Sequence, residues 1–274
     1  MALNPKTFAK NATIIQIDID PSELGKNVDV DLAIAGDVCY VLSGMLPLIE
    51  EKKHPDWMKM IHEWQAQDYH PVSDPTRLMP HQVIGEVCSQ CGPEAVYVTD
   101  VGQHQMWAAQ NVNFKKPRRF ISSGGLGTMG FGLGAAIGAA VGTGERSVLV
   151  TGDGSFGMCL NELTTAVTYN VPVVILLMNN GVLGMVRQWQ TLFFNKHYSN
   201  TILDRKTDFV ALARAFGADG EAVDTVAALD KAFEHAFSCD GPYVIDCRID
   251  KDEFVLPMLP PGGSMDDIIM KVGE

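Results

Sequence analysis

Two short polar groups in the sequence have the residue types and the spacing to bind a metal ion together with a phosphate. The group GDG at 152–154 and the group NN at 179–180 each follow an apolar run that is typical of a buried strand. A helix-length segment lies between them. Because parallel strands joined by a helix bring their carboxyl ends to one edge of a sheet, we expect Asp153 and Asn180 to lie close together.

An acid and an amide that meet at a sheet edge suit Mg²⁺, which takes about six oxygen ligands and is commonly held by one or two side chains plus phosphate oxygens. We predict that Mg²⁺ is bound by the Asp153 carboxylate, the Asn180 side-chain oxygen and the backbone carbonyl of Val182. Diphosphate oxygens and water would complete the shell. The glycines of the GDG group let the backbone approach the phosphates, and a helix expected after Gly157 points its N–H groups at them. Either polar group alone is more typical of a turn or a strand end, so the pair carries the prediction.

A second glycine-rich segment leaves another class of enzyme open. Residues 125–130, GLGTMG, match the pattern GxGxxG of dinucleotide-binding proteins and lie between a short strand and a helix. Asp153 ends the next strand, where a dehydrogenase would place a ribose-binding acid. Two features count against this interpretation. The preceding segment RFISS is short and polar for a first Rossmann strand, and Asp153 is better explained by its partner Asn180.

The scaffold for these residues is visible from residue 80 onward, where helix-like and strand-like segments alternate. Such alternation predicts a parallel sheet covered by helices on both faces. The fold class is therefore α/β, a doubly wound parallel sheet, preceded by a partial α/β middle domain. The expected strands are 95–100, 119–122, 147–153, 171–180 and 243–250, and the expected helices are 80–91, 130–142, 159–169, 207–216 and 225–237.

We divide the chain into three segments. Residues 1–50 contain a strand, a strand-like stretch that ends at Asp37, and a helix at 38–50, and they are typical of the last third of an α/β domain whose beginning is absent. Residues 51–79 are polar and rich in proline, and we predict a linker with one amphipathic helix. Residues 80–274 form the sheet domain with a C-terminal tail.

Composition and charge exclude several classes of partner. Hydrophobic residues make up 46% of the 274 residues, which is enough for a sizeable core, and the formal net charge of −12 argues against nucleic acid. We find no apolar run of the roughly 18 residues that a membrane span needs, and no signal peptide at the N-terminus. These observations predict a soluble, cytoplasmic protein that binds no membrane.

The two polar groups match the motif that binds thiamine diphosphate (ThDP), and further segments resemble the acetolactate synthase family in particular, among relatives such as glyoxylate carboligase and pyruvate oxidase. The resemblance covers essentially the whole chain. Its segments are DVGQHQMWAAQ (100–110), SSGGLGTMGFGLGAAIGA (122–139), GDGSFGMCLNELTTAV (152–167), NNGVLGMVRQWQTLFFNKHYS (179–199) and FVLPMLPPGG (254–263).

The resemblance implies a role for each matching position. Met129 would hold ThDP in its bent form, and Trp189 would shape the pocket for the second substrate. Outside this context Met129 is typical of core filler, Trp189 of an interface and His104 of a loop. The residues implied to line the cofactor site are Val101, Gly102, Gln103, His104, Gly127, Met129, Gly154, Ser155, Leu183, Gly184 and Met185.

The first segment is similar to the second half of the FAD site in the middle domain of this family, where the flavin is structural rather than redox-active. Asp18 would lie near the ribose or adenine, and Asp37 would stand at the next strand end. Two acids that merely cap strand ends are an equally open alternative. The first half of the FAD site is missing, so we do not expect stable flavin binding.

The activity implied is the ThDP- and Mg²⁺-dependent condensation of two pyruvates to 2-acetolactate and CO₂, or of pyruvate with 2-oxobutyrate, in branched-chain amino-acid biosynthesis. In this family the activating glutamate lies on a separate pyrimidine-binding domain. No glutamate in this sequence stands in that context, so we assign no catalytic residue and expect the chain alone to be inactive. The partners implied are a second copy or a pyrimidine-domain half, and a small regulatory subunit. A fragment, a natural half-subunit, another ThDP carboligase such as glyoxylate carboligase, and a non-catalytic ThDP-binding module all stay open, and the abrupt start inside a domain favours the fragment.

Overall fold

The computed structural model describes residues 4–66, 73–74 and 76–272, which form two compact units. Unit 2 comprises Pro71–Val255 and contains the large sheet, and unit 1 comprises Met1–His70 together with the tail Leu256–Glu274. The sequence analysis assigned this tail to the 80–274 segment, whereas its contacts group it with the N-terminal residues. Part of the predicted linker, residues 67–72 and 75, lies outside the described residues.

The sheet of unit 2 has six strands, all parallel, in the order β4-β3-β5-β6-β8-β7. The chain runs from β3 outward to β4 and then returns past β3 to β5, so the direction of winding reverses between β3 and β5. This topology confirms the predicted α/β class. The strands are β3 (Val96–Thr99), β4 (Phe120–Ser122), β5 (Ser147–Gly152), β6 (Val173–Asn179), β7 (Asp219–Val223) and β8 (Tyr243–Arg248).

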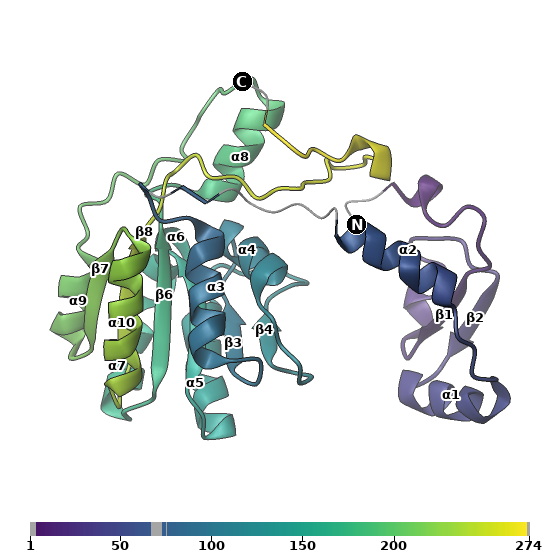
Figure 1. Cartoon of the computed structure of the whole chain (residues 1–274), viewed down its shortest axis with the longest axis horizontal. Coiled ribbons are helices and arrows are strands. Elements are labelled where there is room, and N and C mark those ends of the chain that lie inside the picture. Colours follow the sequence, from purple (N-terminus) through teal and green to yellow (C-terminus); the bar gives the residue numbers. More distant parts are fainter. Residues whose placement is uncertain (1–3, 67–72, 75, 273–274) are drawn as a thin grey trace. The chain divides into compact units, whose positions relative to one another are not determined.

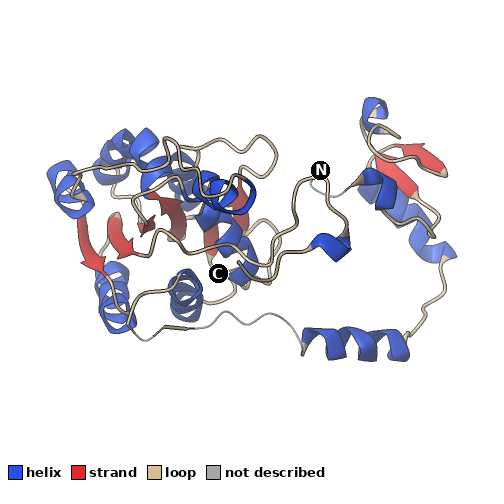
Figure 2. Cartoon of the chain, turned by 90° about the horizontal axis from the view of Figure 1, so that it is seen from above, coloured by secondary structure: helices blue, strands red, loops and turns tan. Residues whose placement is uncertain are grey.

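Helices cover both faces of this sheet, as Figures 1 and 2 show. Helices α3, α4 and α10 share one apolar core with the strands, and α5, α6, α7 and α9 share the other. The helices are α3 (Pro80–Cys91), α4 (Gln103–Asn111), α5 (Gly132–Thr143), α6 (Asp153–Cys159), α7 (Leu163–Thr168), α8 (Gly184–Phe193), α9 (Phe209–Phe216) and α10 (Val226–Ser238).

The central strands explain why both faces must be covered. Successive side chains of a strand point to opposite faces. Leu176 of β6 therefore packs into the first core, while its neighbours Ile175 and Leu177 pack into the second, and all three are fully buried. A continuous apolar run such as β6 is stable only when helices exclude water from both of its sides.

Several elements differ from the sequence-based prediction. Helices α4 and α8 and strand β7 were not predicted, and most of the predicted helix at 159–169 is a 3₁₀ turn at Leu160–Glu162 followed by the short helix α7. Helix α6 begins at Asp153 instead of after Gly157, because Gly152 is already the extended N-cap residue. An acid in the first turn is favourable there, since it lies at the positive end of the helix dipole.

Unit 1 contains two parallel strands, β1 (Ile15–Asp18) and β2 (Leu32–Ala35), followed by α1 (Val38–Met45). Helix α2 (Pro55–Gln65) is the amphipathic helix expected in the linker. Short 3₁₀ turns complete the unit. Across the described parts of both units, no helix combines the length and the apolar character that crossing a membrane requires.

Candidate functional site

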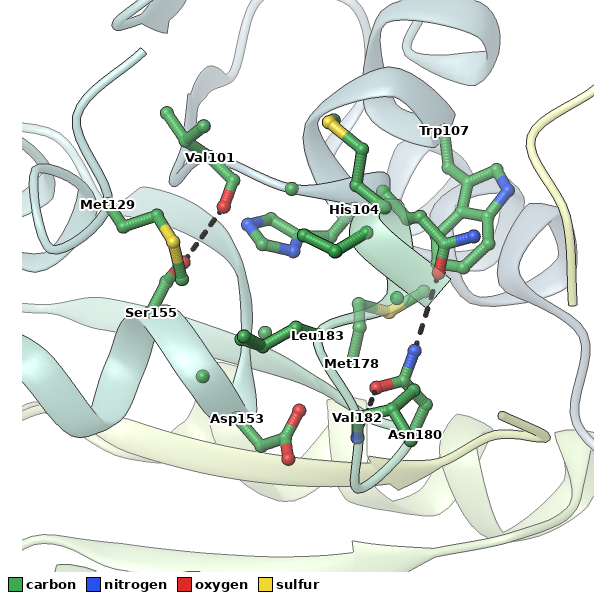
Figure 3. A pocket seen from close by; sticks show the side chains of 17 residues that line it. Val101, His104, Trp107, Met129, Asp153, Ser155, Met178, Asn180, Val182 and Leu183 are labelled. Atoms are coloured by element: carbon green, nitrogen blue, oxygen red, sulfur yellow. Dashed lines mark hydrogen bonds between the residues drawn. The ribbon is translucent and has the colours of Figure 1, made fainter. Parts of the chain in front are cut away.

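A pocket of about 140 Å³ lies at the carboxyl edge of the large sheet, where three neighbouring strands end (Figure 3). Its walls come from the segments that follow β3, β5 and β6. This is the place where the winding of the sheet reverses, and ligands of open α/β sheets bind at such points because the connecting segments diverge to opposite faces there. The fold therefore provides a crevice before any particular side chain is considered.

Asp153 and Asn180, predicted from their spacing to converge, both line this pocket. The Asp153 carboxylate and the Asn180 side-chain oxygen point into the same space in Figure 3. Asp153 is 3% exposed, and burial raises the pKa of its carboxyl to about 6. The Asn180 side-chain oxygen accepts a hydrogen bond of 3.2 Å from the backbone N–H of Val182. One carboxylate and one amide oxygen suit Mg²⁺ if a ligand supplies further oxygens.

The described residues contain no group of three or more His, Cys, Asp or Glu side chains that could hold a metal on their own. A metal at this pocket would therefore need oxygens from another source. A diphosphate is such a source, since Mg²⁺ in proteins is commonly shared between side chains and phosphate groups. The donor set of the pocket thus fits a metal that arrives with a phosphorylated cofactor better than it fits a metal bound by protein alone.

The His104 side chain is buried, and its Nε2 atom has no hydrogen-bond partner among the described residues. Its ring packs against two glycines: a Cβ atom on Gly102 would lie 2.7 Å from the ring, and one on Gly152 would lie 2.8 Å from it. Burial lowers the pKa of His104 to about 3, so the imidazole is neutral. An unpaired nitrogen at the wall of a pocket indicates a place where a polar ligand atom would be stabilised.

The predicted ThDP positions all line the pocket except Gly127. Ser155 donates a hydrogen bond of 2.9 Å to the Val101 carbonyl, which ties the segment after β5 to that after β3. Met129 lies beside Gly154 and lines the pocket, whereas Gly127 does not line it. The predicted residues that line the pocket are Val101, Gly102, Gln103, His104, Met129, Asp153, Gly154, Ser155, Asn180, Val182, Leu183, Gly184 and Met185.

Sequence reasoning missed several residues of this site. Trp107 lines the pocket from α4, one helical turn after Gln103 and His104, and that spacing is the signal that could have revealed it. Asp100 stands at a predicted strand end, as Asp153 and Asn180 do, but had no predicted role. It is fully buried, and one of its oxygens accepts 2.9 Å hydrogen bonds from the N–H groups of Val101 and Gly130. Asp100 therefore holds two loops of the site together.

Arg205 was also missed, because it stands in an irregular segment without a recognisable pattern. Its guanidinium donates a hydrogen bond of 2.8 Å to the backbone carbonyl of Asp153 and lies directly over Gly157. A side chain at position 157 would collide with it. The segment that carries Arg205 also pairs with the segment after β6, since the Leu183 N–H donates to the Thr201 carbonyl over 2.7 Å. These contacts stabilise the backbone around both Asp153 and Asn180.

Trp189 does not line the pocket that contains Asp153. It lies on α8 and lines a second, more open hollow together with Phe193, whose ring packs edge-on against the indole with 5.9 Å between centroids. Met185 and Val186 line both spaces. The first turn of α8 therefore borders both pockets.

Asp18 and Asp37 lie in unit 1, at the carboxyl ends of β1 and just after β2. Asp18 accepts a hydrogen bond of 3.0 Å from the Asp20 N–H, and Asp37 is the N-cap of α1, where it accepts from the Tyr40 N–H over 2.9 Å. Both acids therefore have local structural partners. Their position at the ends of two paired parallel strands is also the position that a ribose-binding acid would take.

The comparisons with known proteins agree with this site. Residues 100–247 match the family described as "Thiamine pyrophosphate enzyme, C-terminal TPP binding domain", and residues 1–45 match the one described as "Thiamine pyrophosphate enzyme, central domain". The first match contains every residue that lines the pocket. The chain belongs to the thiamine pyrophosphate enzyme family.

Curated relatives that the chain matches include several acetolactate synthases. The chain is 42% identical over 277 residues to "Acetolactate synthase" of Mycobacterium leprae, which covers 96% of this chain and 44% of that protein. It is 40% identical over 271 residues to "Acetolactate synthase isozyme 2 large subunit" of Escherichia coli, covering 97% and 48%. It is 38% identical over 289 residues to "Probable acetolactate synthase large subunit" of Methanococcus aeolicus, covering 98% and 48%. The chain thus spans just under half the length of the relatives it matches.

Proposed function

We propose that this chain provides the metal- and diphosphate-binding half of an acetolactate synthase active site. The reaction would join two pyruvates to 2-acetolactate with loss of CO₂, or pyruvate to 2-oxobutyrate. The observation that carries the proposal is the meeting of Asp153 and Asn180 in one buried pocket at the reversal point of the sheet. The identity of about 40% to acetolactate synthases over nearly the whole chain supports this reaction over others of the family.

In this proposal Asp153 and Asn180 hold Mg²⁺ with their side-chain oxygens, and the Val182 carbonyl adds a backbone ligand. When ThDP is bound, it supplies the electron sink for decarboxylation. The N–H groups at the start of α6, near Gly154 and Ser155, face the phosphates. The neutral His104 ring offers its unpaired nitrogen to a polar atom of the cofactor. These residues bind and orient the cofactor.

The other predicted positions would shape the cofactor pocket and the access of the second substrate to it. Met129, beside Gly154, supports the organic part of the cofactor from the side of the loop 123–131. Gly127, with φ of +71°, lets that loop turn. Trp189 borders the hollow next to the cofactor pocket, where the second substrate would enter. Asp18 and Asp37 would contact a structural FAD only where the other half of the flavin site is also present, so we do not expect this chain alone to bind FAD stably.

We assign no catalytic base within the chain, and we propose that the activating glutamate comes from a pyrimidine-binding domain. Such a domain could belong to a second chain. A homodimeric contact and a small regulatory subunit are part of the same proposal, since several of the relatives are named large subunits.

The test is acetolactate formation from pyruvate by the purified chain with ThDP, Mg²⁺ and FAD, alone and with the N-terminal half of a relative added. We expect no product from the chain alone and product on complementation. The Asp153→Ala chain is the matched control and should not complement. Product from the chain alone would contradict the missing base, and ThDP binding without turnover in the complemented mixture would support a non-catalytic module instead.

A further inference from the structure

A row of buried side-chain amides connects Asn180 to the segment that follows β8. Gln103, at the start of α4, and Gln188, in the middle of α8, are 4% and 3% exposed. The Gln103 amide donates to the Gln188 side-chain oxygen over 2.8 Å, and Gln188 in turn pairs with the backbone of Val255. We call this row, Asn180–Gln103–Gln188–Val255, the amide relay.

The backbone of Val255 determines the orientation of the Gln188 side-chain amide. The Val255 N–H donates to the Gln188 side-chain oxygen over 2.9 Å, and the Gln188 amide nitrogen donates to the Val255 carbonyl over 3.0 Å. A backbone N–H only donates and a carbonyl only accepts. Reversing the Gln188 amide would place its nitrogen against the Val255 N–H and its oxygen against the Val255 carbonyl. These contacts are unfavourable, so the orientation of the Gln188 amide is determined.

The orientation of Gln188 then determines that of Gln103. The Gln103 nitrogen donates to two acceptors, the Gln188 side-chain oxygen over 2.8 Å and the Glu253 backbone carbonyl over 2.9 Å. The Gln103 amide oxygen must therefore face the other way. There it accepts from the Asn180 amide nitrogen over 3.4 Å, one of the contacts drawn in Figure 3.

The last step sets the direction of the Asn180 oxygen. Because its nitrogen donates to Gln103, its oxygen faces the Val182 N–H and the space in front of Asp153. Reversing the Asn180 amide would bring its oxygen against the Gln103 oxygen and its nitrogen against the Val182 N–H. Two unfavourable pairs would replace two hydrogen bonds in a buried site, where unpaired polar groups are most costly.

Gly184 provides independent support for the relay. A Cβ atom on this first residue of α8 would overlap the Gln103 side-chain oxygen and lie 2.9 Å from the Asn180 amide nitrogen. The relay therefore passes directly over the glycine, and any larger residue would displace it. The three atoms nearest to this Cβ position all belong to Gln103 or Asn180. The side chains of the amide relay therefore occupy the space that the glycine leaves.

We propose that Gln188 is a positioning residue that acts through Gln103 to present the Asn180 oxygen, and not its nitrogen, to the metal. The inference rests on the proposed function, since the metal site is part of it. It links metal binding to α8, the same helix that carries Trp189 one residue further along. A substitution in α8 that breaks the amide relay should then weaken metal binding, although Gln188 does not line the pocket.

The first test is the affinity of the chain for Mg²⁺ in saturating ThDP, measured by titration calorimetry. Gln188→Met keeps the length of the side chain and removes the relay, and we expect about 10-fold weaker Mg²⁺ binding, as for other outer partners of metal ligands. Gln190→Met is the matched control. Gln190 lies on the same helix and also pairs with one backbone unit, through its nitrogen to the Ser199 carbonyl and its oxygen to the Ser199 N–H. Equal Mg²⁺ affinities of the two variants would overturn the proposal.

A second comparison separates orientation from general destabilisation. Both oxygens of a carboxylate can bind a metal, so the Asn180→Asp variant does not need an amide held in one direction. We expect Gln188→Met to cost no Mg²⁺ affinity when it is combined with Asn180→Asp. A loss of the same size in both backgrounds would show that Gln188 acts only on folding and would overturn the relay.

The third measurement does not depend on metal binding. The side-chain amide protons of Asn180, observed by NMR in the metal-free chain, should exchange slowly in the wild type and in Gln190→Met, and at least about fivefold faster in Gln188→Met, as expected for one lost hydrogen bond. Unchanged exchange in Gln188→Met would overturn the relay. If the wild-type chain binds no Mg²⁺ while the amide protons respond as expected, the proposed metal site fails and the relay stands as a structural network.

Discussion

The six-stranded sheet of unit 2 and the two-stranded sheet of unit 1 are both parallel, yet their apolar side chains differ in burial. Leu149 and Leu176 at the centre of the large sheet are fully buried. In the small sheet Ile15 is 51% exposed and Leu32 is 50% exposed. Over the described residues 4–66 no side chain is buried. Two paired strands have too few neighbours to exclude water from both faces, whereas six strands with helices on each side form two cores.

This difference decides where a precise binding site can form. A site needs side chains held by packing and by second hydrogen-bond partners. In unit 2 the loops around Asp153 and Asn180 are tied to each other and to the core through Asp100, Arg205 and the amide relay. In unit 1 Asp18 and Asp37 have only local backbone partners. The pocket around Asp153 and Asn180 is therefore the part of the molecule in which single substitutions should have the clearest effects.

The comparison is tested most strongly by matched leucine truncations. Leu176→Ala in β6 should lower the free energy of unfolding by about 2–5 kcal/mol, because it leaves a cavity between two packed faces. Leu32→Ala in β2 should lower it by less than about 1 kcal/mol, since half of that side chain is already in water. Urea unfolding followed by circular dichroism measures both. Similar losses would show that unit 1 is packed as tightly as unit 2.

A second effect is expected from pH, and it concerns His104 in unit 2. Burial lowers the pKa of His104 from its ordinary value of 6.5 to about 3. Below pH 6.5 the unfolded chain binds a proton at this position and the folded chain does not, so stability falls as the pH falls. The slope contributed is about 1.4 kcal/mol per pH unit between the two values.

Unfolding of the wild type and of His104→Gln between pH 7 and pH 4 isolates this contribution, because the carboxylates titrate in both proteins. The wild type should lose stability more steeply than the variant. Parallel curves would mean that the His104 ring is protonated or solvated in the folded protein.

The smallest expected effect compares two aspartates with the same local role. Asp37 caps α1 in unit 1 and Asp208 caps α9 in unit 2, each by accepting a backbone N–H over 2.9 Å. Replacing an N-cap aspartate by alanine costs about 1 kcal/mol. In Asp208→Ala this should appear in the global free energy of unfolding, because α9 packs into the second core through Phe209. In Asp37→Ala it should appear as roughly fivefold faster amide exchange confined to α1. Global destabilisation by Asp37→Ala would contradict the loose packing of α1 in unit 1.

Much of this fold could be predicted because its strands are continuous apolar runs and its helices are periodic. The pairing of Asp153 with Asn180 in one pocket also followed from the spacing of two strand ends. Strand β7 escaped notice because it is a partly exposed edge strand that contains Asp219 and Glu221 among small residues. The register of α6 was wrong, since nothing in the local sequence shows that Gly152 already caps the helix.

The amide relay could not be predicted from any local pattern in the sequence. Gln188 and Gln190 flank the same tryptophan, and the sequence gives no reason to treat them differently. The structure separates them: Gln188 faces Val255 inside the fold, and Gln190 pairs with Ser199 at the surface. The distinction comes from the backbone of Val255, 67 residues away along the chain in the segment after β8, and only the tertiary structure brings it to α8.

We propose that unit 2 binds ThDP through a metal held by Asp153 and Asn180, and calorimetric titration of the chain with ThDP tests this most directly. We predict binding in the presence of Mg²⁺, and affinity at least about 10-fold lower without Mg²⁺ or in Asp153→Ala. Asp219→Ala, which removes an exposed carboxylate on β7, should bind as the wild type does. Equal affinity for ThDP with and without Mg²⁺, unchanged in Asp153→Ala, would contradict the account.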